Sequence, residues 1–182
     1  MIKKGNALIA TPSVIGDLYF HRSVIFMIEN DNKNSMGFII NKKLDFKLNE
    51  VVNDLKYLFP LYYGGPVEPD NLFFIYKSKI IVSGSRSITK NIKCGGDFNE
   101  IIQLINGDKI TKSDIKFFLG YSGWTESQIE VELKNKNWEL ISYLDCKILF
   151  SNYTKNIWKK NLTRINKKYQ LWINTPDNPN HN

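Results

Sequence analysis

Residues 115–128 read IKFFLGYSGWTESQ and combine three signals for local structure. The run Ile115–Tyr121 has the length and the aromatic content of a β-strand. Two glycines near its end supply the backbone freedom that a tight turn needs. Thr125, followed three residues later by Gln128, is typical of a capping box and predicts a helix over Glu126–Lys134. The stretch therefore predicts a strand, a turn and a helix in direct succession.

Short apolar runs separated by Gly, Pro, Asn and Asp continue on both sides of this stretch. They predict strands at Ala7–Ala10, Val24–Glu29, Met36–Asn41, Leu61–Tyr63, Leu72–Tyr76, Lys79–Val82, Ile115–Tyr121, Trp138–Ser142 and Lys147–Phe150. Helical spacing predicts further helices at Leu48–Leu55 and at Phe98–Ile105, the second capped by Asp97. Because hairpin-like neighbours are mixed with single helices, this order favours an α+β fold over a regular βαβ alternation.

The last quarter of the chain predicts an amphipathic basic helix. Its apolar positions recur at the spacing of one helical face, at Ile157, Trp158, Leu162, Ile165, Tyr169 and Trp172. We favour a helix that docks this face on the sheet and leaves its lysines in solvent. The alternative is an element that binds a membrane surface or nucleic acid. Two prolines predict an extended tail over residues 175–182.

The length of 182 residues fits one domain over residues 1–182, with the C-terminal helix and tail beginning at about residue 152. The formal charge is +7, but residues 1–146 carry +1 and residues 147–182 carry +6, so the basicity is local. Only three of the 25 basic residues are Arg, whose planar fork suits phosphate and base contacts. The composition therefore argues against a DNA binder that reads sequence.

The sequence also predicts no membrane span and no targeting signal. No run approaches the roughly 18 to 20 apolar residues of a membrane span, so we expect none. The first apolar run has four residues, too short for a signal peptide, and the expected location is the cytoplasm. Cys94 and Cys146 form no Cys-x-x-Cys motif and are expected to be small apolar groups of the interior.

Residues for catalysis or metal binding are sparse. The only histidines are His21 and His181, without Cys or carboxylates at ligand spacing, so we expect no metal and no cofactor. Residues 120–124 lie between a predicted strand and helix, like a nucleophile elbow, but Trp124 stands where that motif needs Gly. We expect no catalytic residue. A hydrolase that uses Ser122 or Cys94 is an alternative.

Six segments occur in a characteristic order: Gly5–Pro12, Asp17–Ile25, Gly37–Asn41, Gly64–Val67, Gly120–Trp124 and Gln128–Glu130. Together they resemble the AlgH/YqgE family of bacterial proteins, from about residue 5 to the C-terminal tail. The resemblance implies a single α+β domain whose mixed, bifurcated sheet forms a pseudo-barrel flanked by helices. It also implies a cytoplasmic protein of unsettled biochemical role, often labelled a transcriptional regulator. A fold does not by itself supply a function.

Polar and aromatic residues at loop edges form the candidate ligand site, because they fall outside the periodic core positions. They are Arg22, Ser23, Asn41, Gly64, Gly65, Tyr121, Trp124 and Gln128. We therefore predict a non-catalytic binding or regulatory domain with an unidentified small ligand or protein partner. The nucleic-acid alternative is a transcriptional regulator whose duplex binding weakens steeply with salt. It would use Lys159, Lys160, Lys167 and Lys168.

Overall fold

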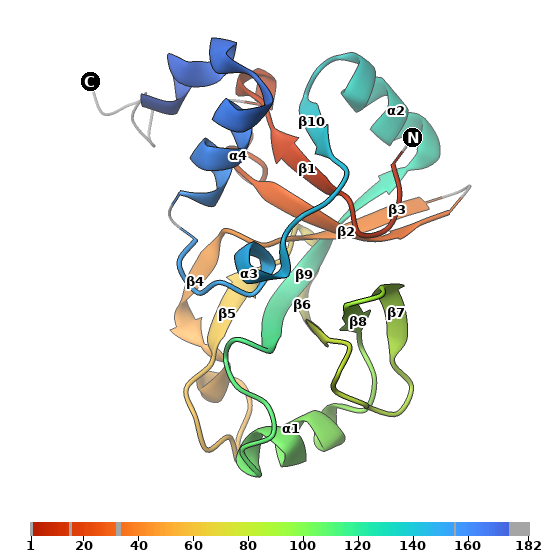
Figure 1. Ribbon diagram of the computed structural model, residues 1–182, viewed down its shortest axis with the longest axis vertical. Helices are drawn as coiled ribbons and strands as arrows, with labels where there is room; N and C mark the ends of the chain where they lie inside the picture. The colour runs from red at the N-terminus through yellow and green to blue at the C-terminus, as the bar shows by residue number, and fades with distance from the viewer. Residues whose placement is uncertain (1, 15, 32–33, 155, 175–182) are drawn as a thin grey trace.

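The computed structural model describes residues 2–14, 16–31, 34–154 and 156–174, and one curled sheet forms its centre (Figure 1). The strands are β1 (Ala7–Ala10), β2 (Val24–Asn30), β3 (Asn34–Ile39), β4 (Lys43–Lys47), β5 (Pro60–Tyr63), β6 (Val67–Lys77), β7 (Arg86–Thr89), β8 (Ile92–Cys94), β9 (Ile115–Thr125) and β10 (Trp138–Ile141). The spatial order is β10-β1-β2-β3-β9-β6-β8-β7, while β5 pairs with β9 and β4 pairs with β5. Only the β5–β9 pair is parallel among these described strands, so the sheet is mixed.

The sheet divides at β9. Residues 117–119 of this strand lie between β6 and β5, whereas residues 122–125 pair with β3. Gly120 stands between the two parts with a φ of +66°. A Cβ on Gly120 would lie 2.4 Å from the carbonyl oxygen of Gly65, so the crossing requires glycine. The result is a bifurcated sheet that curls into a half-barrel with helices around it, which confirms the predicted α+β fold.

The helices are α1 (Phe98–Asn106), α2 (Glu126–Lys134), α3 (Cys146–Leu149) and α4 (Ile157–Ile165), with short 3-10 helices at Pro12–Val14, Leu48–Glu50, Lys167–Gln170 and Trp172–Asn174. Both predicted caps are confirmed. The Asp97 carboxylate accepts two backbone N–H groups at the start of α1, and the Thr125 hydroxyl accepts the Gln128 N–H in α2. The Gln128 side-chain N–H donates to Glu132, and the described residues show no return bond from the Thr125 N–H to the Gln128 side chain, so the capping box is not completed.

Two predicted strands are wrong. Residues 79–82 form a turn and loop, and β7 and β8, which the sequence pattern did not indicate, complete the sheet nearby. The Lys147–Phe150 segment lies in α3 and its C-terminal cap. The Asp145 side chain accepts the backbone N–H of Lys147 at 2.7 Å, an N-cap that starts a helical turn in place of a strand.

The helix predicted over Leu48–Leu55 is reduced to the 3-10 turn Leu48–Glu50. Asn49 explains this difference, because its side chain donates to Leu55 O at 3.1 Å and accepts from Phe59 N at 2.9 Å. Side-chain bonds of this kind offer the backbone an alternative to helical hydrogen bonds.

The predicted C-terminal helix is also interrupted. Asn166 has an extended backbone, with φ of −154°, so α4 ends at Ile165 and two 3-10 helices follow. Asn166 then caps the first of these by accepting the backbone N–H of Lys168. Residues 175–182, where an extended tail is predicted, lie outside the described residues.

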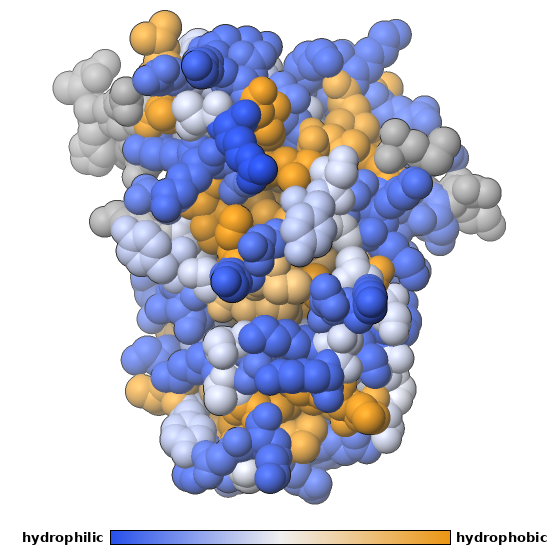
Figure 2. Space-filling view, viewed as in Figure 1, coloured by the Kyte–Doolittle hydropathy of each residue, from blue (hydrophilic) through white to orange (hydrophobic). Residues whose placement is uncertain are grey.

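The docking of this C-terminal segment on the sheet is confirmed. The indole N–H of Trp158 donates to Ala10 O in β1 at 2.7 Å, and the Tyr169 hydroxyl donates to Glu139 in β10 at 2.8 Å. Buried side chains of the segment belong to the largest apolar cluster of the molecule. In Figure 2, apolar side chains are visible between hydrophilic ones over the region of α3, α4 and β10. None of the helices traced here has the length and apolar character needed to cross a membrane.

Candidate functional site

Gly64 and Gly65 follow the end of β5 and lie directly against the backbone of β9. The Gly64 N–H donates to Leu119 O at 2.7 Å, and Gly64 O accepts from both the Ile39 N–H and the Ser122 hydroxyl. A Cβ on Gly64 would lie 2.1 Å from Gly120 O. These glycines therefore allow close backbone approach, and the Gly64 amide is already used within the fold.

Arg22, Ser23 and Asn41 meet at the start of β2. The Asn41 side chain accepts from Val24 N at 2.7 Å and donates to Arg22 O at 2.8 Å, which joins the two chain segments. The Arg22 guanidinium carbon lies 5.2 Å from the centroid of the Trp158 ring, a cation–π contact with α4. Ser23 is fully buried. Arg22 and Asn41 thus make contacts within the protein, whereas the buried Ser23 hydroxyl has no hydrogen-bond partner among the described residues.

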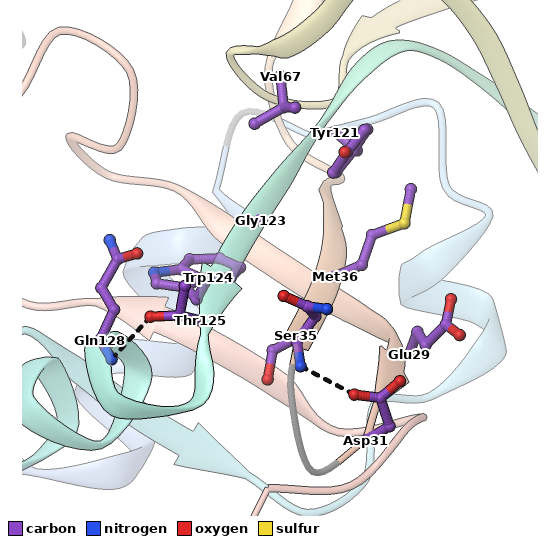
Figure 3. A pocket seen from close by; sticks show the side chains of 11 residues that line it. Glu29, Asp31, Ser35, Met36, Val67, Tyr121, Gly123, Trp124, Thr125 and Gln128 are labelled. Atoms are coloured by element: carbon purple, nitrogen blue, oxygen red, sulfur yellow. Dashed lines mark hydrogen bonds between the residues drawn. The ribbon is translucent and has the colours of Figure 1, made fainter.

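A pocket of about 530 Å³ opens on the other part of the sheet, beside β3 and the end of β9. We call it the β3–β9 pocket (Figure 3). Its lining residues are Glu29, Asp31, Asn34, Ser35, Met36, Val67, Tyr121, Gly123, Trp124, Thr125 and Gln128. Three of the eight predicted site residues, Tyr121, Trp124 and Gln128, therefore border one cavity.

The two aromatic residues of the pocket have different environments. Tyr121 and Met36 lie on one side of β9 in Figure 3, and the Trp124 ring lies on the other. Trp124 is 4% exposed, and its indole N–H donates to Glu132 at 2.9 Å. Its ring is mainly part of the core. Tyr121 is the aromatic side chain that a ligand in this pocket could contact.

The charged side chains that line the pocket are both acidic, Glu29 and Asp31. A carboxylate oxygen of Glu29 lies 3.3 Å from the Arg86 guanidinium, and Asp31 accepts the backbone N–H of Asn34 at 2.8 Å. The sequence pattern did not single out Glu29 or Asp31, because charged residues at strand ends are common on any protein surface. Their charge favours a cationic or N–H-donating ligand group.

Comparison with known proteins agrees with this architecture. The AlgH-like family model matches residues 7–170. This chain belongs to the AlgH-like family. It is 37% identical to the UPF0301 protein of Bacteroides thetaiotaomicron, over 98% of this chain and 91% of that protein. It is 31% identical to the UPF0301 protein Cpha266_0885 of Chlorobium phaeobacteroides, over 100% of this chain and 96% of that protein.

Two solved structures share the AlgH-like fold. The solution structure of the AlgH protein from Pseudomonas aeruginosa has a TM-score of 0.72 at 25% identity, covering 96% of this chain and 95% of that one. The crystal structure of protein DIP2367 from Corynebacterium diphtheriae has a TM-score of 0.74 at 21% identity, covering 94% and 92% of the two chains.

The side chains considered for catalysis lack activated nucleophile geometry in this AlgH-like chain. Ser122 is fully buried and donates to Gly64 O at 3.1 Å. Burial raises the pKa of the Cys94 thiol to about 11, which keeps it protonated at neutral pH. Burial and the charges of Arg22 and Lys42 lower the pKa of His21. Among the described residues, no side-chain hydrogen bond joins His21 to a serine or an aspartate.

A metal site and a basic binding surface are the two other kinds of site considered for this AlgH-like protein. The ranges that the structure covers contain no group of three or more His, Cys, Asp or Glu able to hold a metal ion. Of the lysines considered for nucleic acid, Lys160, Lys167 and Lys168 are exposed and Lys159 is half-buried. Their use in binding nucleic acid stays a prediction.

Lys116 is a residue that the sequence pattern missed. It lies in β9 among the apolar residues of the opening stretch and is buried. Its ammonium group donates to Ile40 O and to Ser151 O, both at 3.1 Å, and lies 4.0 Å from the centroid of the Tyr62 ring. A single Lys inside an apolar strand was the only signal available, and it does not distinguish a buried position from an edge position.

Proposed function

We propose that this AlgH-like protein is a non-catalytic binding domain of regulatory type, and that its ligand occupies the β3–β9 pocket. The observation that carries the proposal is the pocket itself, which combines the Tyr121 ring and the Met36 side chain with the carboxylates of Glu29 and Asp31. Pockets that combine apolar walls with a few polar groups are the usual sites of small-molecule binding. The ligand that fits is a small molecule with an apolar body and a cationic or N–H-donating group.

We also propose that the protein acts in the cytoplasm. Both cysteines, Cys94 and Cys146, are free thiols. Free thiols fit a reducing compartment.

The ligand can be sought by thermal-shift screening of the full chain against a library of small primary amines, amidines and guanidines. We expect hits that raise the melting temperature of the wild type and of Glu130→Gln, an exposed acidic position on α2 outside the pocket lining. Glu29→Gln removes one pocket charge, and Tyr121→Leu removes the aromatic ring while keeping an apolar side chain against Phe73. Both should weaken binding by about tenfold, the loss of one charged or aromatic contact.

The same screen can contradict the proposal. If no compound in the library raises the melting temperature of the wild type, a cationic ligand is excluded. Hits that bind Glu29→Gln and Tyr121→Leu as tightly as the wild type would place the ligand elsewhere.

A further inference from the structure

A second concave surface lies between α3 and α4, away from the β3–β9 pocket. It consists of two adjoining hollows of about 390 and 520 Å³, and both are lined by Ile148, Asn161 and Arg164. We call this surface the α3–α4 groove. Figure 1 shows α3 and α4, the two helices that border it, and Figure 2 shows apolar side chains over this region between hydrophilic ones.

The rim of the groove is cationic. Lys147, Lys160 and Arg164 line it, and none of them forms an ion pair with another residue in the described ranges. Asp145 is the acidic residue of the lining, and its carboxylate is engaged in capping α3. The lining therefore carries three positive charges against one carboxylate.

The floor of the groove is aliphatic. Ile148 and Ile157 line the smaller hollow, and Leu144 and Ile165 line the larger one. Asn161 lies between them, buried, and its side-chain N–H donates to Ile157 O at 2.8 Å. This bond leaves the Asn161 Oδ1 as a polar acceptor in the floor.

Two tyrosines border the groove with large exposed fractions. Tyr143 lines the larger hollow and is 70% exposed, while Tyr153 lines the smaller one and is 66% exposed. Tyr and Arg are enriched in protein interfaces, where a rigid ring buries a large area and still offers a hydroxyl.

We propose that the α3–α4 groove docks an acidic peptide segment of a partner protein, with apolar side chains in the two hollows and carboxylates on the rim. The cations supply charge complementarity for Asp and Glu, and the aliphatic floor suits Leu, Ile or Phe anchors. Single-stranded nucleic acid fits less well, because the two hollows are floored by Ile and Leu, and bases could stack only on the Tyr143 and Tyr153 rings at the border. The groove is independent of the ligand proposed for the β3–β9 pocket.

The test uses a displayed library of random 12-residue peptides, selected on the immobilised full-length protein. Enriched peptides are synthesised with a fluorescent label, and their affinity is measured by anisotropy. The groove variant is Lys147→Gln/Lys160→Gln/Arg164→Gln. The control is Lys43→Gln/Lys90→Gln/Lys109→Gln, which loses the same net charge at exposed positions elsewhere. Circular dichroism melting curves establish that both variants are folded.

We expect enriched peptides to combine Asp or Glu with apolar anchors. Their affinity should fall at least about tenfold for the groove variant, because charge-assisted contacts are lost, and about twofold or less for the control. The proposal is overturned if no peptide is enriched, or if both variants lose affinity equally. It is also overturned if 12-nucleotide rA or dT probes bind in a groove-dependent manner while acidic peptides do not.

Discussion

At the scale of the residue, Lys116 shows how strongly position alters chemistry. The side-chain amine of Lys116 is buried and donates hydrogen bonds to two backbone carbonyls. Burial lowers the pKa of Lys116 from 10.5 to about 7. A buried cation without a carboxylate partner is costly, so the fold favours the neutral amine.

This shift predicts a pH dependence of stability. The folded pKa lies below the unfolded value, so between pH 7 and pH 10 the unfolded chain binds more protons. The contribution of Lys116 to the free energy of unfolding therefore rises with pH in this window. We expect urea denaturation at pH 7, 8 and 9 to show that the free energy of unfolding of the wild type rises relative to that of Lys116→Met as the pH increases. The slope should be at most about 1.4 kcal/mol per pH unit, the value for one proton bound by the unfolded chain and absent from the folded one. Parallel pH profiles of the free energy of unfolding for the two proteins would contradict this prediction.

The contacts of individual residues also explain why only part of the predicted ligand site lines the pocket. Arg22 and Asn41 were chosen because polar groups at loop edges often bind ligands. In the structure Asn41 joins two backbone segments, and Arg22 packs on Trp158. Tyr121 and Gln128 line a cavity. The sequence did not distinguish these two groups, because both consist of polar or aromatic residues beside glycine turns.

At the scale of the element, one carboxylate of α2 accepts hydrogen bonds from two strands of the sheet. Oε2 of Glu132 accepts the indole N–H of Trp124 in β9 at 2.9 Å and that of Trp138 in β10 at 2.7 Å. Both rings are buried, and they pack against each other edge to face. Glu132 therefore ties the helix to two strands that are not neighbours in the sheet.

Replacing Glu132 should destabilise the protein. Glu132→Ala leaves two buried indole N–H groups without their acceptor, and we expect a loss of about 2–4 kcal/mol in the free energy of unfolding. Glu132→Gln retains an acceptor oxygen and should recover part of the lost free energy of unfolding. Glu130→Ala, exposed on the same helix, is the control and should cost less than about 0.5 kcal/mol. Urea denaturation followed by tryptophan fluorescence measures the free energy of unfolding of all three variants. Equal losses for Glu130→Ala and Glu132→Ala would contradict the proposed role of Glu132.

At the scale of the whole molecule, the C-terminal segment is part of the core. Ile157, Trp158, Leu162 and Tyr169 belong to the same buried cluster as residues of β1, β2 and β9. The local excess of positive charge therefore lies on an element whose other face completes the core. We expect this segment to unfold together with the sheet.

Two leucines test this cooperativity. Leu162 is fully buried and Leu171 is 84% exposed. Leu162→Ala should lower the free energy of unfolding of the entire chain by about 2–5 kcal/mol, whereas Leu171→Ala should change it by less than about 0.5 kcal/mol. Tryptophan fluorescence and circular dichroism should report one coincident urea transition for each variant. Two separate transitions would mean that the segment unfolds independently.

The sequence by itself determined the α+β class, the caps at Asp97 and Thr125, and the apolar face of the C-terminal segment. These features are local, because backbone preferences and the side-chain period act over a few residues. Only the tertiary structure decided that β9 divides the sheet, that Lys116 is buried, and that Tyr121 and Gln128 share a pocket with Glu29. These features depend on which distant strands pair, and the periodicity of a single strand does not specify its partner.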